Sequence, residues 1–176
     1  MTTLFIFIEG KHDKIFVDYV LSDYLSKEKS ISVHPVPYAK KSPSTINREI
    51  KSKSDNYLFL SDLDSNETPC ITSKKDLRTK KYSYLNSDRV IIVKEEIESW
   101  FFAGIDTKID QFKNFKVPED TDLITKEDFD ELLREQSIDN KNSFLIEVGK
   151  NFNIELAAQR NASFKYFLDK INKLWT

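Results

Sequence analysis

The sequence predicts an α/β fold with a parallel sheet, and three observations support this prediction. Apolar runs rich in β-branched and aromatic residues occupy residues 4–8, 57–61 and 90–93. Continuous runs of this kind are typical of strands that are buried on both faces. Helical patterns separate the runs, and acidic residues follow each run. Strands that alternate with helices in this way indicate a parallel sheet with right-handed crossovers.

The first elements can be assigned from local patterns. A strand over 3–8 leads into a helix over about 12–26, whose apolar side includes Ile15, Phe16 and Val20. Residues 31–37 alternate and contain two prolines, which suits a strand at the edge of the sheet. Ser42 and Pro43 favour a helix start, because serine caps helices and proline is tolerated at the first helical position.

The next elements complete the sheet. A strand over 57–61 is followed by Ser73 and Asp76, which have the spacing of a capping box and predict a helix that ends near Leu85. A strand over 89–94 then gives the order β-α-β-α-β-α-β. We therefore expect a four-stranded parallel sheet flanked by helices.

The rest of the chain predicts helices alone. Thr125 opens one, a second spans about 142–151, and a third carries an apolar stripe from Phe164 to Trp175. No linker is evident, so we expect these helices to pack on the sheet. The expected division is an α/β core over residues 1–104 and a helical extension of the same domain over 105–176.

Composition excludes several classes of site and location. The 176 residues are 39% apolar and 32% charged, which is typical of a globular chain. Cys70 is the single cysteine and there are two histidines, so an internal disulfide, a cysteine-based zinc site and a histidine-rich metal site are excluded. No apolar run approaches the ~20 residues of a membrane span, and no signal peptide is visible. We expect a cytoplasmic protein without a membrane partner.

Acidic residues follow three of the expected strands. Glu9 follows the first, Asp62 and Asp64 follow the third, and Glu96 and Glu98 follow the fourth. The carboxyl ends of parallel strands meet at one edge, and converging carboxylates repel one another unless a cation neutralises them. The pattern thus predicts a divalent metal site. Other interpretations remain open: a solvated loop acid, a turn-forming aspartate pair, and first-turn acids that favour a helix dipole.

Basic residues gather between the aspartate pair and the fourth strand. We interpret them as a phosphate-binding rim, with a solvated helix face as the alternative. The candidates for contact with nucleic acid are Lys11, Lys74, Lys75, Arg78, Lys80 and Lys81.

Two motifs resemble those of the Toprim superfamily. The segment Phe7-Ile8-Glu9-Gly10, with Asp13, is similar to its first motif, and Phe59-Leu60-Ser61-Asp62-Leu63-Asp64-Ser65 is similar to its second. The resemblance covers roughly residues 3–100. Segments 96–100 and 161–165 look like those of small stand-alone Toprim-like proteins, which are related to the nucleases of the bacterial overcoming-lysogenisation-defect type.

The resemblance implies a Toprim-like fold and a set of functional residues. Glu9 would be a metal ligand or general base, and Asp62 and Asp64 would bind Mg²⁺ or Mn²⁺. Further members of the implied set are Asp13 as an extra acid, Glu96 and Glu98 at a second ion, and Lys165 beside the phosphate. Asn66 stands where topoisomerases carry a third acid, which argues against topoisomerase activity.

Three functions follow from these expectations. The first is a Mg²⁺-dependent phosphodiesterase that acts on DNA or RNA, with a role in defence against phage or other mobile DNA. The second is a non-catalytic module that binds nucleic acid or a partner, such as an ATPase or another subunit of a larger complex. The third is a phosphotransfer domain of receiver type, which ranks lower because those domains place their acid pair after the first strand.

Overall fold

The computed structural model describes residues 2–63, 68 and 70–175. Internal contacts divide the chain into two compact units, Met1–Val93 and Lys94–Thr176. The sequence-based division placed the end of the α/β core after residue 104 instead. We describe each unit by itself.

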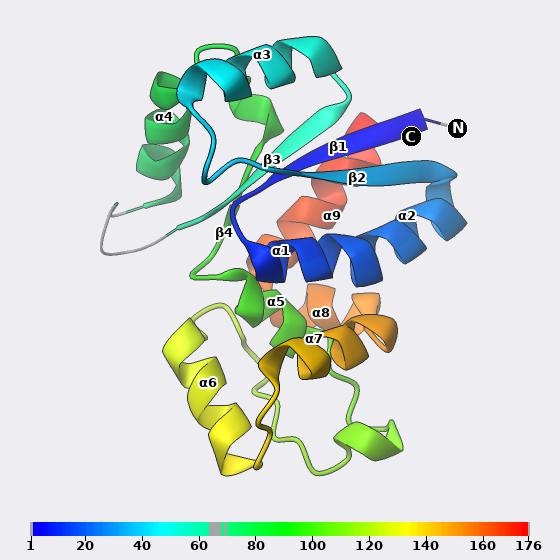
Figure 1. Cartoon of the computed structure of the whole chain (residues 1–176). Helices are drawn as coiled ribbons and strands as arrows, with labels where there is room; N and C mark the ends of the chain where they lie inside the picture. Colours follow the sequence, from blue (N-terminus) through cyan, green and yellow to red (C-terminus); the bar gives the residue numbers. More distant parts are fainter. Residues whose placement is uncertain (1, 64–67, 69, 176) are drawn as a thin grey trace. The chain divides into compact units, whose positions relative to one another are not determined.

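The first unit contains a parallel sheet of four strands (Figure 1). The strands are β1 (Thr2–Ile8), β2 (Ile31–Pro37), β3 (Tyr57–Asp62) and β4 (Val90–Val93). Their order is β2-β1-β3-β4, and all three pairings are parallel. The α/β class and the parallel sheet predicted from the sequence are thus confirmed. β2 lies at an edge of the sheet, as its two prolines indicate.

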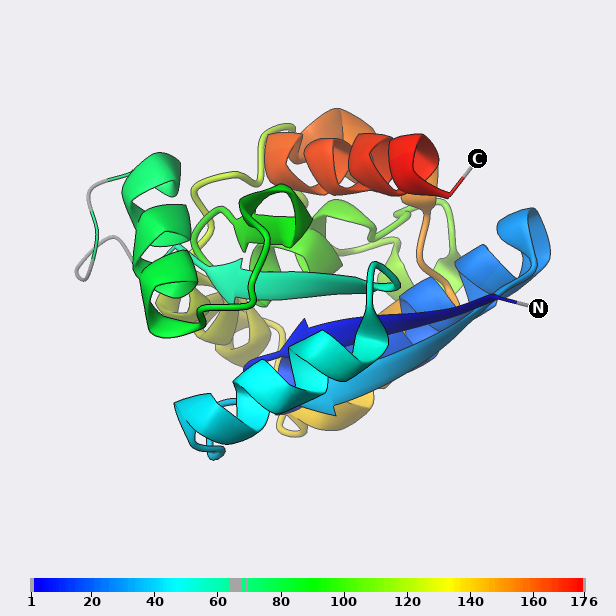
Figure 2. The same cartoon turned by 90° about the horizontal axis from the view of Figure 1, so that it is seen from above.

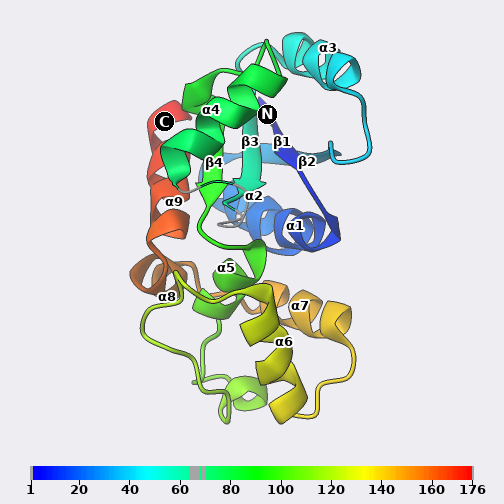
Figure 3. The same cartoon turned by 90° about the vertical axis from the view of Figure 1, so that its left-hand side faces the viewer.

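Helices cover both faces of this sheet. They are α1 (Lys11–Phe16), a π-helical turn (Val17–Leu21), α2 (Ser22–Lys29), α3 (Pro43–Lys53), α4 (Ile71–Lys81) and a 3₁₀ turn (Ser87–Arg89). Figures 1 and 3 show α1 and α2 on one face and α3 and α4 on the other. From above, α3 passes in front of the strands (Figure 2). Ser42 caps α3 as predicted, since its Oγ accepts the Thr45 N–H at 3.3 Å.

The start of α4 differs from the sequence-based expectation. Ser73 was the predicted cap, but Cys70 occupies that position, and the Lys74 N–H already bonds to the Cys70 carbonyl at 3.1 Å. The helix also ends at Lys81 rather than near Leu85. The backbone bonds of the first turn, rather than the capping-box spacing, therefore set the position of the helix.

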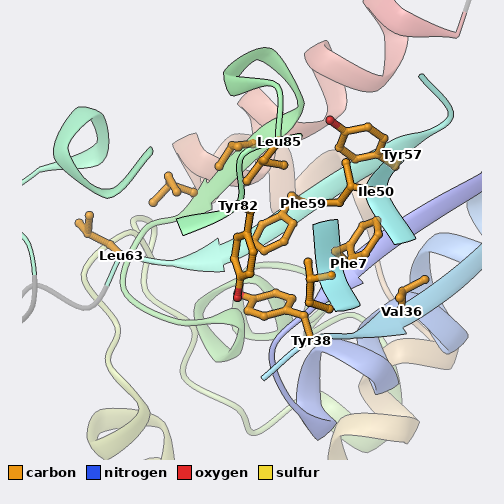
Figure 4. Packing of buried hydrophobic residues seen from close by; sticks show 12 residues of the cluster. Phe7, Val36, Tyr38, Ile50, Tyr57, Phe59, Leu63, Tyr82 and Leu85 are labelled. Atoms are coloured by element: carbon orange, nitrogen blue, oxygen red, sulfur yellow. The ribbon is translucent and has the colours of Figure 1, made fainter. Parts of the chain in front are cut away.

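Aromatic rings dominate the core between the sheet and the α3–α4 layer (Figure 4). The ring of Tyr38 stacks on Phe59 at a centroid distance of 4.4 Å, and Phe7 stacks on the same residue at 5.7 Å. Tyr82, just beyond α4, tilts against Phe59 at 5.3 Å. Residues of alternate parity, such as Leu58 and Leu60, are also fully buried. Burial of both parities explains why the strands read as unbroken apolar runs.

The second unit is helical. Its elements are α5 (Ile97–Ala103), a 3₁₀ turn (Asp110–Phe112), α6 (Lys126–Glu135), α7 (Lys141–Lys150), α8 (Ile154–Arg160) and α9 (Ala162–Leu174). Three of them match the predicted helices, and Thr125 forms a capping box with Asp128 at the start of α6. The buried rings of Trp100, Phe164 and Phe167 pack together in its core. None of the helices in the described part of the chain has the length and apolar character to cross a membrane.

Gly104 allows the close approach of a phenylalanine ring in the second unit. A Cβ at this position would lie 2.2–2.5 Å from ring atoms of Phe152. Phe152 in turn packs edge-on against Phe164, at a centroid distance of 5.6 Å. A side chain at residue 104 thus forces the ring to shift against the core.

We predict that Gly104→Ala lowers the free energy of unfolding by about 1–3 kcal/mol, because overpacking displaces the Phe152 ring. Urea denaturation monitored by circular dichroism measures the change. Gly10→Ala is the matched control, since a Cβ there would meet only Asp13 Oδ2 at 3.4 Å. Equal stability of the Gly104→Ala protein and the parent would contradict the prediction.

Candidate functional site at the carboxyl ends of β1 and β3

Glu9 follows β1 directly and contacts two residues of the same unit. The Tyr38 hydroxyl donates to Glu9 Oε2 at 3.0 Å, and Arg78 Nη2 lies 3.5 Å from the same oxygen. The side chain of Glu9 is 43% exposed, so the carboxylate lies at the surface of the site. Both contacts use Oε2. Oε1 is therefore the oxygen that a ligand can approach without displacing either partner.

Arg78 extends from α4 to the end of β3. Its Nε donates to Ser61 Oγ at 2.8 Å, and its guanidinium carbon lies 5.9 Å from the centre of the Tyr38 ring. The residue is only 7% exposed. A buried cation is stable only with hydrogen bonds and a compensating charge, which Ser61 and Glu9 provide here.

Tyr38 is a neutral hydrogen-bond donor in this arrangement. Burial raises the pKa of its hydroxyl well above the ordinary value of 10.0, and the neighbouring Glu9 carboxylate raises it further. The hydroxyl oxygen also lies 3.1 Å from the Leu60 carbonyl. Tyr38 was absent from the sequence-based candidates, because a tyrosine after an edge strand carries no motif signal.

The register of the sheet explains which residues meet Glu9. Phe7 lies opposite Phe59 in the β1–β3 pair, so Glu9 comes level with Ser61. Side chains alternate between the two faces along a strand. Asp62 is therefore directed to the opposite face of the sheet from Ser61. Asp62 ends β3 and is partly buried. Within the described residues, the structure thus brings Glu9 to Ser61 and Arg78.

Two other predicted acids belong to this unit. Asp13 is buried, and its Oδ2 accepts the Gly10 N–H at 2.8 Å, which stabilises the start of α1. Asp64 lies outside the described residues. Among residues 2–63, 68 and 70–175, no group of three or more His, Cys, Asp or Glu side chains has a metal-binding arrangement. The metal-binding roles of these acids stay predictions.

The acids that follow β4 begin a helix. The sequence suggested that Glu96 and Glu98 face one side of a continuing strand, but β4 ends at Val93 and Glu95 has a φ of 58°. Glu96 is the N-cap residue of α5 and Glu98 lies in its first turn. The helix-start interpretation is therefore confirmed. Both residues belong to the second unit, so their convergence with Glu9 and Asp62 stays a prediction.

Glu96 and Glu98 have contrasting surroundings. Glu98 is 3% exposed and pairs with Lys141 Nζ at 2.9 Å; Lys141 also contacts Asp130 at 2.7 Å. Burial raises the pKa of Glu96 above its ordinary value of 4.5, and the charge of Glu98 adds to the shift. Within the described residues, Oε2 of Glu96 is buried and has no hydrogen-bond partner.

The expected basic rim divides into two groups. Lys74 and Arg78 lie four residues apart on one face of α4 and are buried, with 1% and 7% exposure. Lys75 is partly exposed, and the remaining candidates Lys11, Lys80 and Lys81 are exposed. Only the second group has the solvent access that a surface rim requires.

The segment 161–165 has a structural role in the second unit. Asn161 caps α9 through its Oδ1, which accepts the Phe164 N–H at 3.0 Å. Ser163 accepts a hydrogen bond from Trp100 Nε1 at 2.8 Å, and Asp122 accepts one from the Ala162 N–H at 2.9 Å. Lys165 is exposed, and its predicted role at a phosphate stays a prediction.

Comparison of the chain with family models, with curated proteins and with solved structures found no match. The resemblance to Toprim proteins therefore rests on the sequence segments described above.

We predict that Glu96→Gln removes a pH-dependent loss of stability. The folded state raises the pKa of Glu96, so ionisation costs more in the folded than in the unfolded protein. The contribution of this group to stability should fall as the pH rises from about 4.5 through the raised pKa. The free energy of unfolding of Glu96→Gln, relative to the parent, should accordingly increase across this range in urea titrations with a chelator present.

Glu98→Gln is the matched comparison. It weakens the ion pair with Lys141 and should cost about 1–3 kcal/mol of stability at neutral pH. Equal pH profiles for the Glu96→Gln protein and the parent would show that Glu96 titrates alike in the folded and unfolded states.

Proposed function

We propose that this protein hydrolyses phosphodiester bonds of nucleic acid with the help of Mg²⁺ or Mn²⁺. The observation that carries the proposal is the pairing of an exposed carboxylate, Glu9, with a buried arginine, Arg78, at the carboxyl ends of adjacent parallel strands. Parallel α/β sheets bind their ligands at this edge. An anionic phosphate needs a cation such as arginine, and a hard divalent cation needs carboxylate oxygens.

The donor chemistry of the site fits a hard divalent cation. Carboxylate oxygens are the ligands that Mg²⁺ prefers, usually one or two together with water and substrate oxygens. Asp62 and Asp64 would hold the cation past the end of β3, and Glu9, which follows β1, would reach it over the same edge of the sheet. The bound cation would polarise the phosphate and lower the pKa of a coordinated water. Before substrate binds, Tyr38 and Arg78 hold Glu9 through Oε2, so that Oε1 would face the cation.

The proposal extends to the setting of the activity. Nucleic acid is the partner that the exposed lysines of α4, among them Lys80 and Lys81, would contact. We further propose a cytoplasmic location and a role in defence against phage or other mobile DNA. Both follow from the sequence expectations and from the resemblance to Toprim nucleases.

We predict that Glu9→Gln and Asp62→Asn each lower nuclease activity at least about a hundredfold, because loss of a metal ligand removes several kcal/mol of transition-state stabilisation. The assay follows cleavage of labelled DNA and RNA with Mg²⁺ or Mn²⁺. Asp55→Asn is the matched control, since Asp55 precedes β3 at its opposite end and is largely exposed. Full activity in either test variant would exclude this mechanism.

A second function is favoured by one specific observation. The charge of the Glu9 carboxylate is already compensated by Arg78, and Tyr38 donates a hydrogen bond to it, without a metal ion. This arrangement also suits a non-catalytic module that binds nucleic acid or a partner subunit, such as an ATPase.

Calorimetric titration with Mn²⁺ separates the two functions. The catalytic proposal predicts binding by the parent protein and at least about tenfold weaker binding by Glu9→Gln and Asp62→Asn, because each removes a charged oxygen ligand. Asp55→Asn should bind like the parent. Absence of Mn²⁺ binding to the parent would favour the non-catalytic module.

A further inference from the structure

Arg78 is held more closely by a neutral group than by its counter-charge. Its Nε lies 2.8 Å from Ser61 Oγ, whereas Nη2 lies 3.5 Å from Glu9 Oε2. Charge-assisted N–H···O bonds usually measure about 2.7–2.9 Å. The guanidinium is therefore anchored by Ser61, and its contact with the carboxylate is loose.

The two members of the ion pair also differ in how firmly they are enclosed. Arg78 is 7% exposed and lies beside the ring of Tyr38, while Glu9 exposes 43% of its side chain. Lys74, one turn earlier on the same face of α4, is 1% exposed. α4 thus brings two buried cations to this side of the sheet, and the exposed member of the Glu9–Arg78 pair is the anion.

The departure of Glu9 leaves the Tyr38 hydroxyl with an acceptor, and the incoming anion takes the place of Glu9 beside Arg78. The Tyr38 hydroxyl has a single proton and lies near two acceptors, Glu9 Oε2 at 3.0 Å and the Leu60 carbonyl at 3.1 Å. Once Glu9 moves away, the proton retains the Leu60 carbonyl as its acceptor. The usual cost of an unsatisfied buried hydroxyl is thereby avoided.

We propose that Arg78 binds a phosphate oxygen and that Glu9 is the resting anion which this phosphate displaces. The proposal rests on the proposed function for its substrate class, and it adds the order of events at the site. Arginine offers parallel N–H groups that match phosphate oxygens better than a single carboxylate oxygen at 3.5 Å does. Displacement also frees Oε2 of Glu9, so phosphate entry and cation binding favour each other.

The test measures the affinity of the ¹⁵N-labelled protein for inorganic phosphate by NMR titration in the presence of a chelator. Arg78→Met should bind phosphate at least about tenfold more weakly than the parent, since the charge-assisted bonds are lost. Glu9→Gln should bind it about fivefold more tightly, because a competing anion is removed. Arg78→Lys should lie between Arg78→Met and the parent, because it keeps the charge but loses the parallel N–H groups.

Arg134→Met is the matched control, because Arg134 is an exposed arginine of the second unit. Equal phosphate affinity of the Arg78→Met protein and the parent would overturn the binding site. Affinity in Glu9→Gln equal to or weaker than that of the parent would overturn the displacement. If Arg78→Met fails to fold, Arg78→Lys and Glu9→Gln decide the question through their opposite expected shifts.

The titration contains neither a divalent cation nor a scissile bond. A chain that binds phosphate as expected but lacks nuclease activity would contradict the proposed function alone. A chain that cleaves nucleic acid but binds phosphate equally well after Arg78→Met would contradict the displacement alone.

Discussion

The parallel pairing of β1 with β3 is the constraint on which the candidate site depends. With Phe7 opposite Phe59, the two rings stack within the core and Glu9 comes level with Ser61. A slip of one residue would turn Phe7 toward the opposite face of the sheet and move Glu9 away from Arg78. The burial of the aromatic rings therefore determines the position of the carboxylate. The packing of the core, rather than the loop that carries Glu9, therefore sets the geometry of the site.

The aromatic core also makes a buried arginine tolerable. The Tyr38 ring stacks on Phe59 and also lies beside Arg78, and the Tyr38 hydroxyl donates to Glu9. Desolvation of a guanidinium is costly unless its donors find acceptors and its charge is compensated. Ser61 supplies the first and Glu9 the second. Tyr38, Ser61 and Glu9 thus stabilise Arg78 in the fold, and the phosphate binding that we propose would use the same arginine.

The sequence was sufficient to predict the strands of the sheet. It was insufficient to predict which charged side chains of α4 are buried. Because both faces of the strands are buried, they appear in the sequence as continuous apolar runs. Ser42 marks the start of α3 because it caps that helix. The burial of Lys74 and Arg78 depends on the helical phase of α4, whose N-cap residue, Cys70, lies three residues before the expected cap, Ser73. Charge and spacing alone left these residues indistinguishable from exposed lysines such as Lys80. After β4 ends at Val93, Glu95 adopts a left-handed backbone conformation and Glu96 begins a helix. No glycine at residue 95 signals this conformation in the sequence.

Repulsion between carboxylates has more than one physical solution. The strand-end acids predict a metal ion, and within the described residues the chain also supplies cations beside acids of both units. Arg78 compensates Glu9 in the first, and Lys141 compensates Glu98 in the second. The two ion pairs differ in burial and distance. Glu98 is 3% exposed and lies 2.9 Å from Lys141 Nζ, while Glu9 is exposed and lies 3.5 Å from Arg78 Nη2. A tight buried pair is structural, because breaking it strands a charge. A loose pair with an exposed anion breaks at lower cost, and we propose that an incoming phosphate replaces Glu9 in it.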